Sequence, residues 1–359
     1  MAEKLRVGMI GCGGIANNKH LPNLKGTGRA EVVAFCDIVE SKAIDSAKKF
    51  GTADAKVYTD YKKLLDDSTI DIIYVCTPNK SHSFITIDSL ESGKHVMCEK
   101  PMAKTAKEAR AMVEAAKRTG KVLTIGYQHR YDKESQYLKK AVLNDDLGDI
   151  YFAKAHALRR RAVPTWGVFL NEEEQGGGPL IDIGTHALDL TLWLMNNYKP
   201  KSVMGNVYKK LNGNGNCGNV FGVWKPEEFT VEDSAFGFIT MENGATISLE
   251  ASWALNVLDY SEAKATLCGT KAGADMKNGV RFNGDHLGCL YETSPTLGGG
   301  GVAFFEGGSS DPRIQEQEVF LDAITKGTPL IIEPEQACVV TEILEAIYES
   351  AKTGKLVTF

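Results

Sequence analysis

The sequence predicts an α/β protein of two domains, and three observations support this prediction. Up to about residue 145, short apolar runs alternate with amphipathic stretches, which is typical of a parallel sheet covered by helices on both faces. After Leu147-Gly148-Asp149-Ile150, longer runs alternate polar and apolar residues, which indicates an antiparallel sheet. The length of 359 residues also suits two domains. We expect an N-terminal domain over residues 1–127 and a C-terminal α/β domain with a mainly antiparallel sheet over residues 128–359.

The expected elements follow from the positions of these runs. In the first part we expect strands near 5–10, 31–36, 71–76, 95–98 and 122–126, and helices near 14–25, 40–50, 80–92, 105–119 and 133–144. In the second part, residues 233–253 hold two alternating runs joined by Glu242-Asn243-Gly244, a hairpin signal. Helices are expected over 180–196, 313–326 and 335–353, and the C-terminal helix could pack back on the N-terminal domain. The Gly-rich loops 212–222 and 297–308 could be lids, subunit contacts or solvated loops.

The first apolar run ends in a glycine turn of the form Gly11-x-Gly13-x-x-Ala16. A first glycine allows a tight turn, a second allows the backbone to approach a phosphate, and a small third residue allows helix and strand to pack. The following helix would present free N–H groups to an anion. We therefore expect a Rossmann dinucleotide-binding domain, with Gly11, Gly13, Gly14, Ile15 and Ala16 at the pyrophosphate, although such turns also occur without a ligand.

An acidic residue, Asp37, stands at the end of the second strand-like run. This is the position from which a carboxylate binds the adenosine ribose hydroxyls. Asp37 would repel a ribose 2′-phosphate, and Ile38 and Val39 offer no cation to bind one. The sequence thus favours NAD over NADP.

The composition argues against nucleic acid and membrane surfaces as partners. The formal net charge is −5, and charges of both signs are interspersed without a polybasic patch. The eight cysteines are scattered, which predicts a reduced compartment. No run reaches the roughly 18 apolar residues of a membrane span. We expect a cytoplasmic protein that acts on a small molecule.

Two groups of residues could carry chemistry. Glu99-Lys100-Pro101 ends the fifth expected strand, at the sheet edge where ligands of open α/β folds bind. Pro101 would keep Lys100 extended, and the bond between them could be cis. On the helix expected at 180–196, Asp182, His186 and Asp189 fall on one face. A carboxylate beside an imidazole suits proton transfer near neutral pH. A structural pair is the alternative, and a metal site is less favoured because no further ligand stands nearby.

Taken together, these motifs resemble the Gfo/Idh/MocA oxidoreductases over nearly the whole chain. The resemblance implies a Rossmann domain followed by an α/β domain with a large open sheet. Its motifs are Gly11-x-Gly13-x-x-Ala16, Asp37, Thr77-Pro78-Asn79 with His82, Glu99-Lys100-Pro101, Gly126-Tyr127 with Arg130, Leu147-Gly148, and Gly177-Gly178-x-Leu180-x-Asp182-x-Gly184-x-His186-x-x-Asp189.

The resemblance also implies roles for individual residues. Lys100, Asp182 and His186 would be catalytic. Cofactor contacts would come from the glycine turn and Asp37, from Thr77, Pro78, Asn79 and His82 on the adenosine and pyrophosphate side, from Glu99 and Lys100 at the nicotinamide ribose, and from Gln128. Substrate contacts would come from Lys100, Tyr127, His129, Arg130, Arg159, Trp166, Asp182 and His186. No metal is implied.

The expected reaction is oxidation of a secondary alcohol, which needs a base for the hydroxyl proton and a positive group for the developing alkoxide. His186 is the preferred base and Lys100 the positive group, although these roles could be exchanged. The room suggested by the two Gly-rich loops favours a glucoside oxidised at C3 over an inositol or a free sugar. Three other hypotheses stay open: an oxidoreductase that retains its NAD, a glycosidase that oxidises its substrate transiently, and a non-catalytic sugar sensor. A homo-oligomer, dimer or tetramer, is expected because the antiparallel sheet needs its second face covered.

Overall fold

The computed structural model describes residues 4–297 and 312–359 and divides into two compact units. Unit 1 comprises Met1–Gln128 and Ser309–Cys338, and unit 2 comprises His129–Gly308 and Val339–Phe359. The first boundary lies one residue from the predicted one. The prediction assigned every later residue to the second domain, whereas helix α9 (Pro312–Lys326) belongs to unit 1. Apart from Leu297, the Gly-rich loop 297–308 lies outside the described residues.

The sheet of unit 1 has six parallel strands in the order β3-β2-β1-β4-β5-β6. The bounds are β1 (Leu5–Ile10), β2 (Ala30–Cys36), β3 (Gly51–Tyr58), β4 (Ile72–Val75), β5 (His95–Cys98) and β6 (Leu123–Ile125). Five of these strands were expected. Strand β3 was not expected, because it reads Gly-Thr-Ala-Asp-Ala-Lys-Val-Tyr without an apolar run. As an edge strand, β3 is partly solvated and needs no such run.

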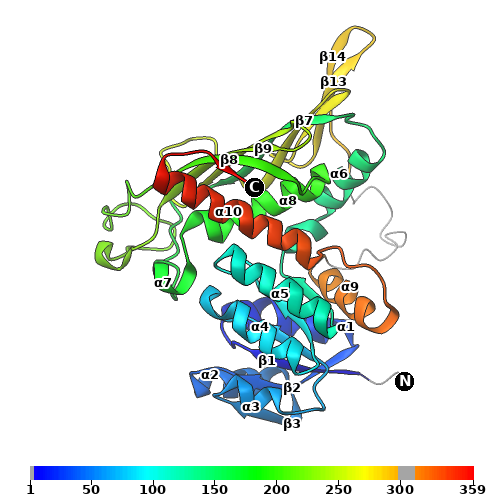
Figure 1. Ribbon diagram of the computed structural model, residues 1–359, viewed down its shortest axis with the longest axis vertical. Helices are drawn as coiled ribbons and strands as arrows, with labels where there is room; N and C mark the ends of the chain where they lie inside the picture. Colours follow the sequence, from blue (N-terminus) through cyan, green and yellow to red (C-terminus); the bar gives the residue numbers. More distant parts are fainter. Residues whose placement is uncertain (1–3, 298–311) are drawn as a thin grey trace. The chain divides into compact units, whose positions relative to one another are not determined.

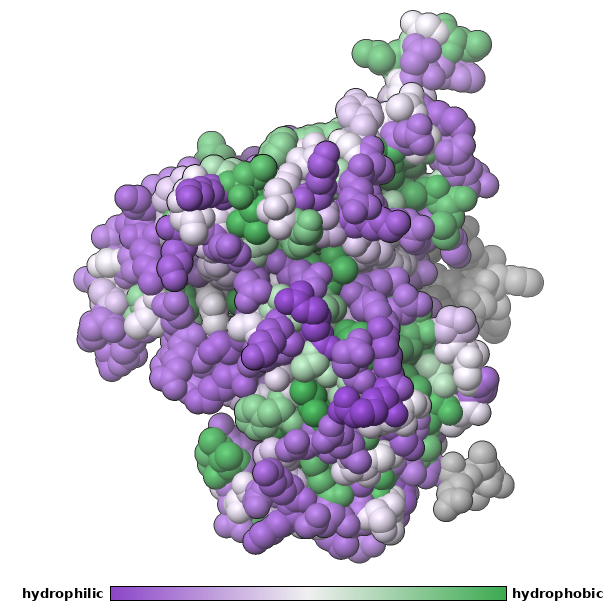
Figure 2. Space-filling model, viewed as in Figure 1, coloured by the Kyte–Doolittle hydropathy of each residue, from purple (hydrophilic) through white to green (hydrophobic). Residues whose placement is uncertain are grey.

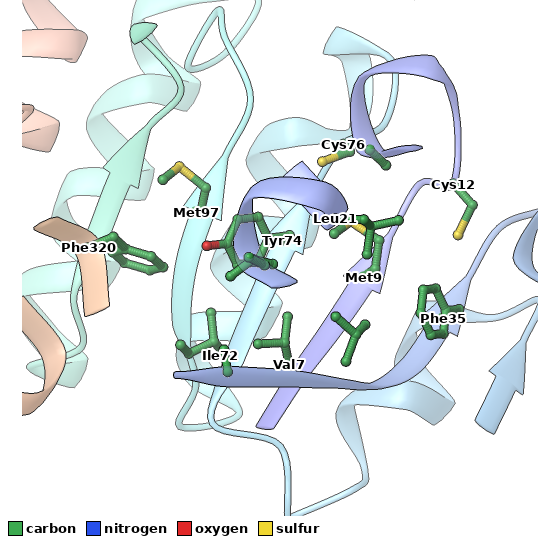
Figure 3. Close-up of a cluster of buried hydrophobic side chains, with 14 of the residues drawn as sticks. Val7, Met9, Cys12, Leu21, Phe35, Ile72, Tyr74, Cys76, Met97 and Phe320 are labelled. Carbon is green, nitrogen blue, oxygen red and sulfur yellow. The ribbon is translucent and has the colours of Figure 1, made fainter. Parts of the chain in front are cut away.

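Helices lie on both faces of this sheet (Figure 1), which confirms the predicted Rossmann domain. They are η1 (Ala16–His20), α1 (Leu21–Thr27), α2 (Glu40–Phe50), α3 (Tyr61–Leu65), η2 (Asn79–Ser81), α4 (His82–Glu91), α5 (Ala106–Thr119) and α9, with η3 (Gln128–Tyr131) at the unit boundary. Buried side chains of β1, β4 and β5 form the core together with Phe320 of α9 (Figure 3). Helix α9 also packs against α1. A segment from the far end of the sequence therefore completes the N-terminal fold.

The first strand residue of β5, His95, gives unit 1 a testable pH dependence. Its Nδ1 accepts the Val122 backbone N–H at 3.0 Å, so the ring is neutral in the fold. Burial, together with the positive charge of Lys121, lowers the pKa of His95 to about 4. The unfolded chain therefore takes up this proton at a higher pH than the fold, and stability is lost as pH falls from about 6.5 through 4.

We expect His95→Gln to flatten this part of the profile, measured as urea unfolding free energy between pH 7 and pH 4. His156→Gln is the matched control, because it removes another partly buried histidine. An unchanged slope in His95→Gln would contradict the assignment.

The sheet of unit 2 has nine strands in the order β14-β13-β12-β11-β7-β10-β9-β8-β15. Strands β7 and β10 pair in parallel and the other neighbours pair antiparallel, so the expected mainly antiparallel sheet is confirmed. The strands are β7 (Ile150–Leu158), β8 (Pro200–Tyr208), β9 (Ser234–Met241), β10 (Thr246–Ser252), β11 (Glu262–Gly269), β12 (Ala272–Asp275), β13 (Arg281–His286), β14 (Cys289–Thr293) and β15 (Val357–Thr358). The helices are α6 (Lys133–Leu143), α7 (Glu172–Gln175), η4 (Leu180–Gly184), α8 (Thr185–Met195), η5 (Pro226–Glu228) and α10 (Pro334–Thr353), which runs across the division after Cys338.

One face of the large sheet is covered and the other carries exposed apolar side chains. Ile347 of α10 packs on β8 and β9, where a Cβ at Gly237 would lie 2.7 Å from Ile347 Cδ1. On the opposite face, Met204 and Phe238 pair across β8 and β9 and remain 40% and 54% exposed. The hairpin β13–β14 projects from this sheet with hydrophobic surface at its tip (Figures 1 and 2). No helix of the described ranges is long and apolar enough to cross a membrane.

Candidate active site

The glycine turn follows β1 and has the geometry of a phosphate-binding loop. Gly11 has φ +91°, and a Cβ there would lie 2.4 Å from the Cys76 carbonyl oxygen, so no other residue fits. At Gly13, by contrast, a Cβ would meet no atom within 4 Å. The backbone at Gly13 therefore borders open space at the start of a helix, where a pyrophosphate can approach the free N–H groups. Gly14 and Ile15 are exposed and Ala16 is buried against the sheet.

Asp37 is positioned beside this turn by two backbone hydrogen bonds. Its Oδ2 accepts from the Cys12 N–H and its Oδ1 from the Val39 N–H, both at 2.9 Å. The side chain of Ile38 is 90% exposed. The carboxylate thus lies where the sequence analysis expected a ribose ligand, next to the phosphate turn, and the neighbouring side chain carries no cation.

The loop after β4 is connected to the Lys100–Pro101 turn by His82. The His82 Nε2 lies 2.8 Å from the Thr77 carbonyl oxygen, and Nδ1 lies 2.8 Å from the Pro101 carbonyl oxygen. Burial lowers the pKa of His82, against the effect of the two carbonyls. Since the ring is 1% exposed, His82 holds two loops together, while Thr77, Pro78 and Asn79 remain accessible.

Lys100 follows β5 and is joined to Pro101 by a cis peptide bond. The Lys100 backbone N–H donates to Glu99 Oε2 at 3.0 Å, and Lys100 is partly exposed whereas Glu99 is buried. The Gly126 Cα lies against the Glu99 carboxylate, because a Cβ at Gly126 would be 3.0 Å from Oε1. Farther along, Tyr127 is buried and Gln128 is partly exposed.

In unit 2, the segment after Gly176-Gly177-Gly178 holds the predicted acid–base residues. Within residues 177–194, all of them described, Asp182 and His186 are the two that are not buried. Residues 180–184 form a π-helical turn before α8 begins, and such turns occur at functional sites. The segment therefore presents one carboxylate and one imidazole, a turn apart, from an otherwise buried helix.

Both side chains contact further residues of the site. The Trp253 indole N–H donates to Asp182 Oδ2 at 3.0 Å, and this tryptophan is fully buried. The rings of His129 and His186 meet edge to face with 4.9 Å between centroids. His129 Nδ1 lies 2.9 Å from Asp132 Oδ2. Unit 2 thus brings Asp182 together with Trp253, and His186 with His129.

The other predicted substrate residues of unit 2 have different surroundings. Arg159 forms two hydrogen bonds with Glu262, at 2.6 and 2.7 Å. Burial would lower the pKa of Arg159, but Glu262 and Asp182 raise it. Trp166 is 51% exposed and stacks edge to face with Phe221 at 4.7 Å between centroids. Arg159 therefore lies close enough to Asp182 for their charges to interact. Trp166 forms an exposed aromatic pair with Phe221.

Arg130 is fully buried and forms an ion pair with Asp189. Its Nη2 and Nε bind the two oxygens of Asp189 at 2.6 and 3.0 Å. The sequence analysis placed Asp189 on the same face as Asp182 and His186. Asp189 is 2% exposed, so it is buried with Arg130, whereas Asp182 and His186 are partly exposed.

Two residues of this site escaped the sequence analysis, Trp253 and Glu232. The buried Glu232 carboxylate accepts the backbone N–H groups of Gly178 and Leu180, at 2.9 and 3.1 Å, and the Tyr348 hydroxyl at 2.9 Å. It thus caps the helix that carries Asp182. Burial raises the pKa of Glu232 against these donors. The only signal in the sequence was the glycine run, whose absent side chains make room for Glu232 and Tyr348.

The glycine turn and Asp37 are typical of a dinucleotide-binding domain, and a carboxylate beside an imidazole is suited to acid–base chemistry. Comparisons with known proteins identify the family. Residues 5–127 match the model "Oxidoreductase family, NAD-binding Rossmann fold", and residues 135–275 match "GFO/IDH/MocA C-terminal domain". The chain belongs to the Gfo/Idh/MocA family of oxidoreductases. It is accordingly an NAD-dependent oxidoreductase, as the sequence analysis predicted.

Individual relatives include enzymes named for sugar oxidation. D-glucoside 3-dehydrogenase of Escherichia coli (strain K12) is 38% identical over 353 residues, covering 98% of this chain and 97% of the relative. Glucose-6-phosphate 3-dehydrogenase of Bacillus subtilis (strain 168) is 33% identical over 214 residues, 58% of each chain. A levoglucosan dehydrogenase in complex with NADH and levoglucosan has a TM-score of 0.83 at 22% identity, covering 99% of both chains. This last likeness concerns the fold alone.

Asp37 makes the preference for NAD testable. We expect Asp37→Ala to weaken NAD binding and to lower the NAD-to-NADP affinity ratio about tenfold, since the carboxylate no longer repels a 2′-phosphate. The ratio of dissociation constants, measured by calorimetry, separates this effect from loss of the hydrogen bond to Cys12. Glu40→Ala removes a nearby exposed carboxylate and serves as the control. An unchanged ratio in Asp37→Ala would refute the ribose role.

Proposed function

We propose that the protein oxidises a secondary hydroxyl of a sugar or glycoside, with the C3 hydroxyl of a glucosyl group as the favoured site and a 3-keto sugar as product. The observation that carries the proposal is the Asp182 and His186 pair on an otherwise buried helix. The substrate class is supported by the 38% identity with a D-glucoside 3-dehydrogenase over nearly the full length of both chains.

In this proposal His186 is the base that accepts the hydroxyl proton. A neighbouring imidazole, His129, packs against it, and Asp182, oriented by Trp253, binds the substrate and favours the positive charge that His186 gains. Lys100 stabilises the negative charge that develops on the substrate oxygen. NAD, when bound, supplies the hydride acceptor. Exchange of roles between Lys100 and His186 is the alternative assignment.

The residues proposed to hold NAD fit the group. The open backbone at Gly13 receives the pyrophosphate, Asp37 binds the adenosine ribose, and Thr77, Pro78 and Asn79 border the same side. Glu99, which is buried, acts on the nicotinamide side through Lys100, and Gln128 adds a contact. His82 does not need to touch the cofactor in this arrangement, because its ring connects the Thr77 loop to the turn at Pro101.

For the substrate, we propose direct contacts from Lys100, Tyr127, His129, Asp182 and His186. Trp166 would offer a ring face to the sugar or its aglycone. Arg159 and Arg130 are held in ion pairs with Glu262 and Asp189, so we assign them to positioning of the site.

The test is a screen of glucosides, free sugars, sugar phosphates and inositols with added NAD. The expected result is NADH formation with a glucoside, and an NMR spectrum of the product with a carbonyl at C3. Oxidation of inositol alone would overturn the substrate class. Release of aglycone without NADH would favour the transient-oxidation glycosidase, and NADH absorbance on the purified protein without added cofactor would favour a retained NAD.

We also infer a homo-oligomer that buries the open face of the large sheet. The support is the exposed apolar group of Met204, Tyr208 and Phe238 on β8 and β9, with the half-buried Phe236 beside Tyr208, since such patches mark contact surfaces. Light scattering should give a dimer or tetramer, and Phe238→Lys should shift it toward monomer. A wild-type monomer at micromolar concentration would refute the inference.

A cytoplasmic location agrees with free buried cysteines.

A further inference from the structure

A group of buried charged side chains lies directly behind Lys100 in unit 1. We call it the Glu99 cluster: Lys19, His20, Glu99 and Glu316, with Gln317 and Tyr74 bonded to them. The Lys19 ammonium lies 3.4 Å from Glu99 Oε1 and 3.0 Å from Glu316 Oε2. These charged side chains come from η1, from the end of β5 and from α9, and all are nearly inaccessible. Buried charges are costly, so their presence beside Lys100 calls for a reason.

The hydrogen bonds assign His20 as neutral. The Tyr74 hydroxyl lies 2.5 Å from Gln317 Oε1, and Gln317 Nε2 lies 3.3 Å from Glu316 Oε2. The amide nitrogen therefore faces the carboxylate, and the same nitrogen lies 3.4 Å from His20 Nδ1. His20 Nδ1 is thus the acceptor, and Nε2 carries the proton donated to Glu99 Oε1 at 2.7 Å. The Tyr74 side chain, whose hydroxyl begins this series of hydrogen bonds, lies beside Phe320 of α9 (Figure 3).

With His20 neutral, the charges of the cluster do not cancel. Glu99 and Glu316 contribute two negative charges and Lys19 one positive charge, which leaves one negative charge in excess. Burial would raise the pKa of Glu99, but Lys19 and the His20 hydrogen bond hold it well below its usual value. Burial would also lower the pKa of Lys19, but Glu316 and Glu99 raise it. Both groups therefore stay ionised at neutral pH.

The excess negative charge of the cluster lies close to Lys100, because Glu99 belongs to the cluster. Glu99 is the neighbour of Lys100 in the chain, and the second carboxylate oxygen, Oε2, accepts the Lys100 backbone N–H. The Lys100 charge also interacts with the Glu99 carboxylate, so the cluster offsets the positive charge of the ammonium. A positively charged nicotinamide ring bound beside Lys100 would meet balanced surroundings, whereas the neutral ring of the reduced cofactor would gain nothing from the offset.

We propose that the Glu99 cluster sets the relative affinity of the protein for oxidised and reduced cofactor, and that Glu316 of α9 is the residue that supplies the excess negative charge. Glu316 acts from a segment that lies, in sequence, between the two parts of unit 2. It is a positioning residue for charge and does not itself touch the reacting atoms. The inference rests on the proposed place of Lys100 beside the nicotinamide.

The experiment measures dissociation constants of NAD and NADH without any sugar, by calorimetry and by NADH fluorescence. In Glu316→Gln the cluster loses its excess charge, and NAD should bind about tenfold more weakly while NADH changes less than about threefold, because only the oxidised nicotinamide ring carries a positive charge. Glu318→Gln, on the same helix and outside the cluster, should change neither.

The double variant Lys19→Met with Glu316→Gln separates charge from packing. It removes one charge of each sign and leaves Glu99 in place, so the NAD-to-NADH ratio should return to within about threefold of wild type. Equal losses for both cofactors in Glu316→Gln, or a double variant with a ratio no better than that of the single variant, would overturn the proposal. If Glu316→Gln does not fold, the double variant still tests the proposal. A NAD-to-NADH affinity ratio in the double variant that differs from wild type by more than about threefold would also overturn it.

These outcomes are independent of the substrate. A failed sugar screen with the expected binding ratios would reject the proposed function and keep the role of the cluster. NADH formation with a glucoside, together with an unchanged NAD-to-NADH affinity ratio in Glu316→Gln, would keep the proposed function and reject the role of the cluster.

Discussion

Replacing His186 by alanine is expected to lower kcat for glucoside oxidation about a thousandfold, because the hydroxyl proton then has no positioned base. His186 is one of two residues in 177–194 that are not buried, so truncation should disturb the fold little. The glycine turn and Asp37 belong to unit 1, and the dissociation constant for NAD should stay within about threefold of wild type. Stopped-flow measurement of NADH formation, with calorimetry for NAD, tests both parts.

The matched control is His156→Ala, which removes a histidine of β7 bonded to Thr266 Oγ1 and should retain activity. Lys100→Ala should also lose orders of magnitude in turnover. Its pH profile then decides the roles: if His186 is the base, the acidic limb of the rate profile persists in Lys100→Ala and disappears in His186→Ala. Wild-type turnover in His186→Ala would end the assignment of the base.

The sequence predicted those parts of the fold that depend on local patterns. The five apolar strands of unit 1 and the glycine turn at Gly11 could be predicted, because a buried parallel strand and a tight turn restrict the residues that can form them. The edge strand β3 was missed, since a partly solvated strand carries no such restriction. Helix α9 was predicted, but its place in unit 1 depends on Phe320 and Glu316 meeting residues about 240 to 300 positions earlier, for which a single sequence offers no local signal.

The site shows the same division. Asp182 and His186 could be predicted from their spacing on a helix. The support of Asp182 by Trp253 and the cap provided by Glu232 could not, because both come from residues around β10 and before β9 that look like ordinary strand residues. Arg130 is a related case: the sequence placed it in a family motif and predicted a substrate contact, whereas its buried ion pair depends on a partner 59 residues away, for which the sequence has no local signal.

That partner makes the Arg130–Asp189 pair the site of the largest expected stability effect. Both side chains are essentially inaccessible, and the Arg130 guanidinium also lies 5.8 Å from the Trp193 ring centroid. Burial would lower the pKa of Arg130, but Asp189 raises it, so the charge persists in the fold. We expect Asp189→Ala to reduce the unfolding free energy by about 3–5 kcal/mol, because it leaves a buried guanidinium without its carboxylate. Urea denaturation at pH 7 measures this loss.

Two further variants decide whether Arg130 positions the site or binds the substrate. The double variant Arg130→Met with Asp189→Leu removes both charges, and its loss of stability should be smaller than the sum of the single losses by more than about 1 kcal/mol. Arg130→Lys keeps the charge but loses the second hydrogen bond, so it should be destabilised while KM for the sugar changes little. A rise in KM of about tenfold or more in Arg130→Lys with unchanged unfolding free energy would instead make Arg130 a substrate ligand.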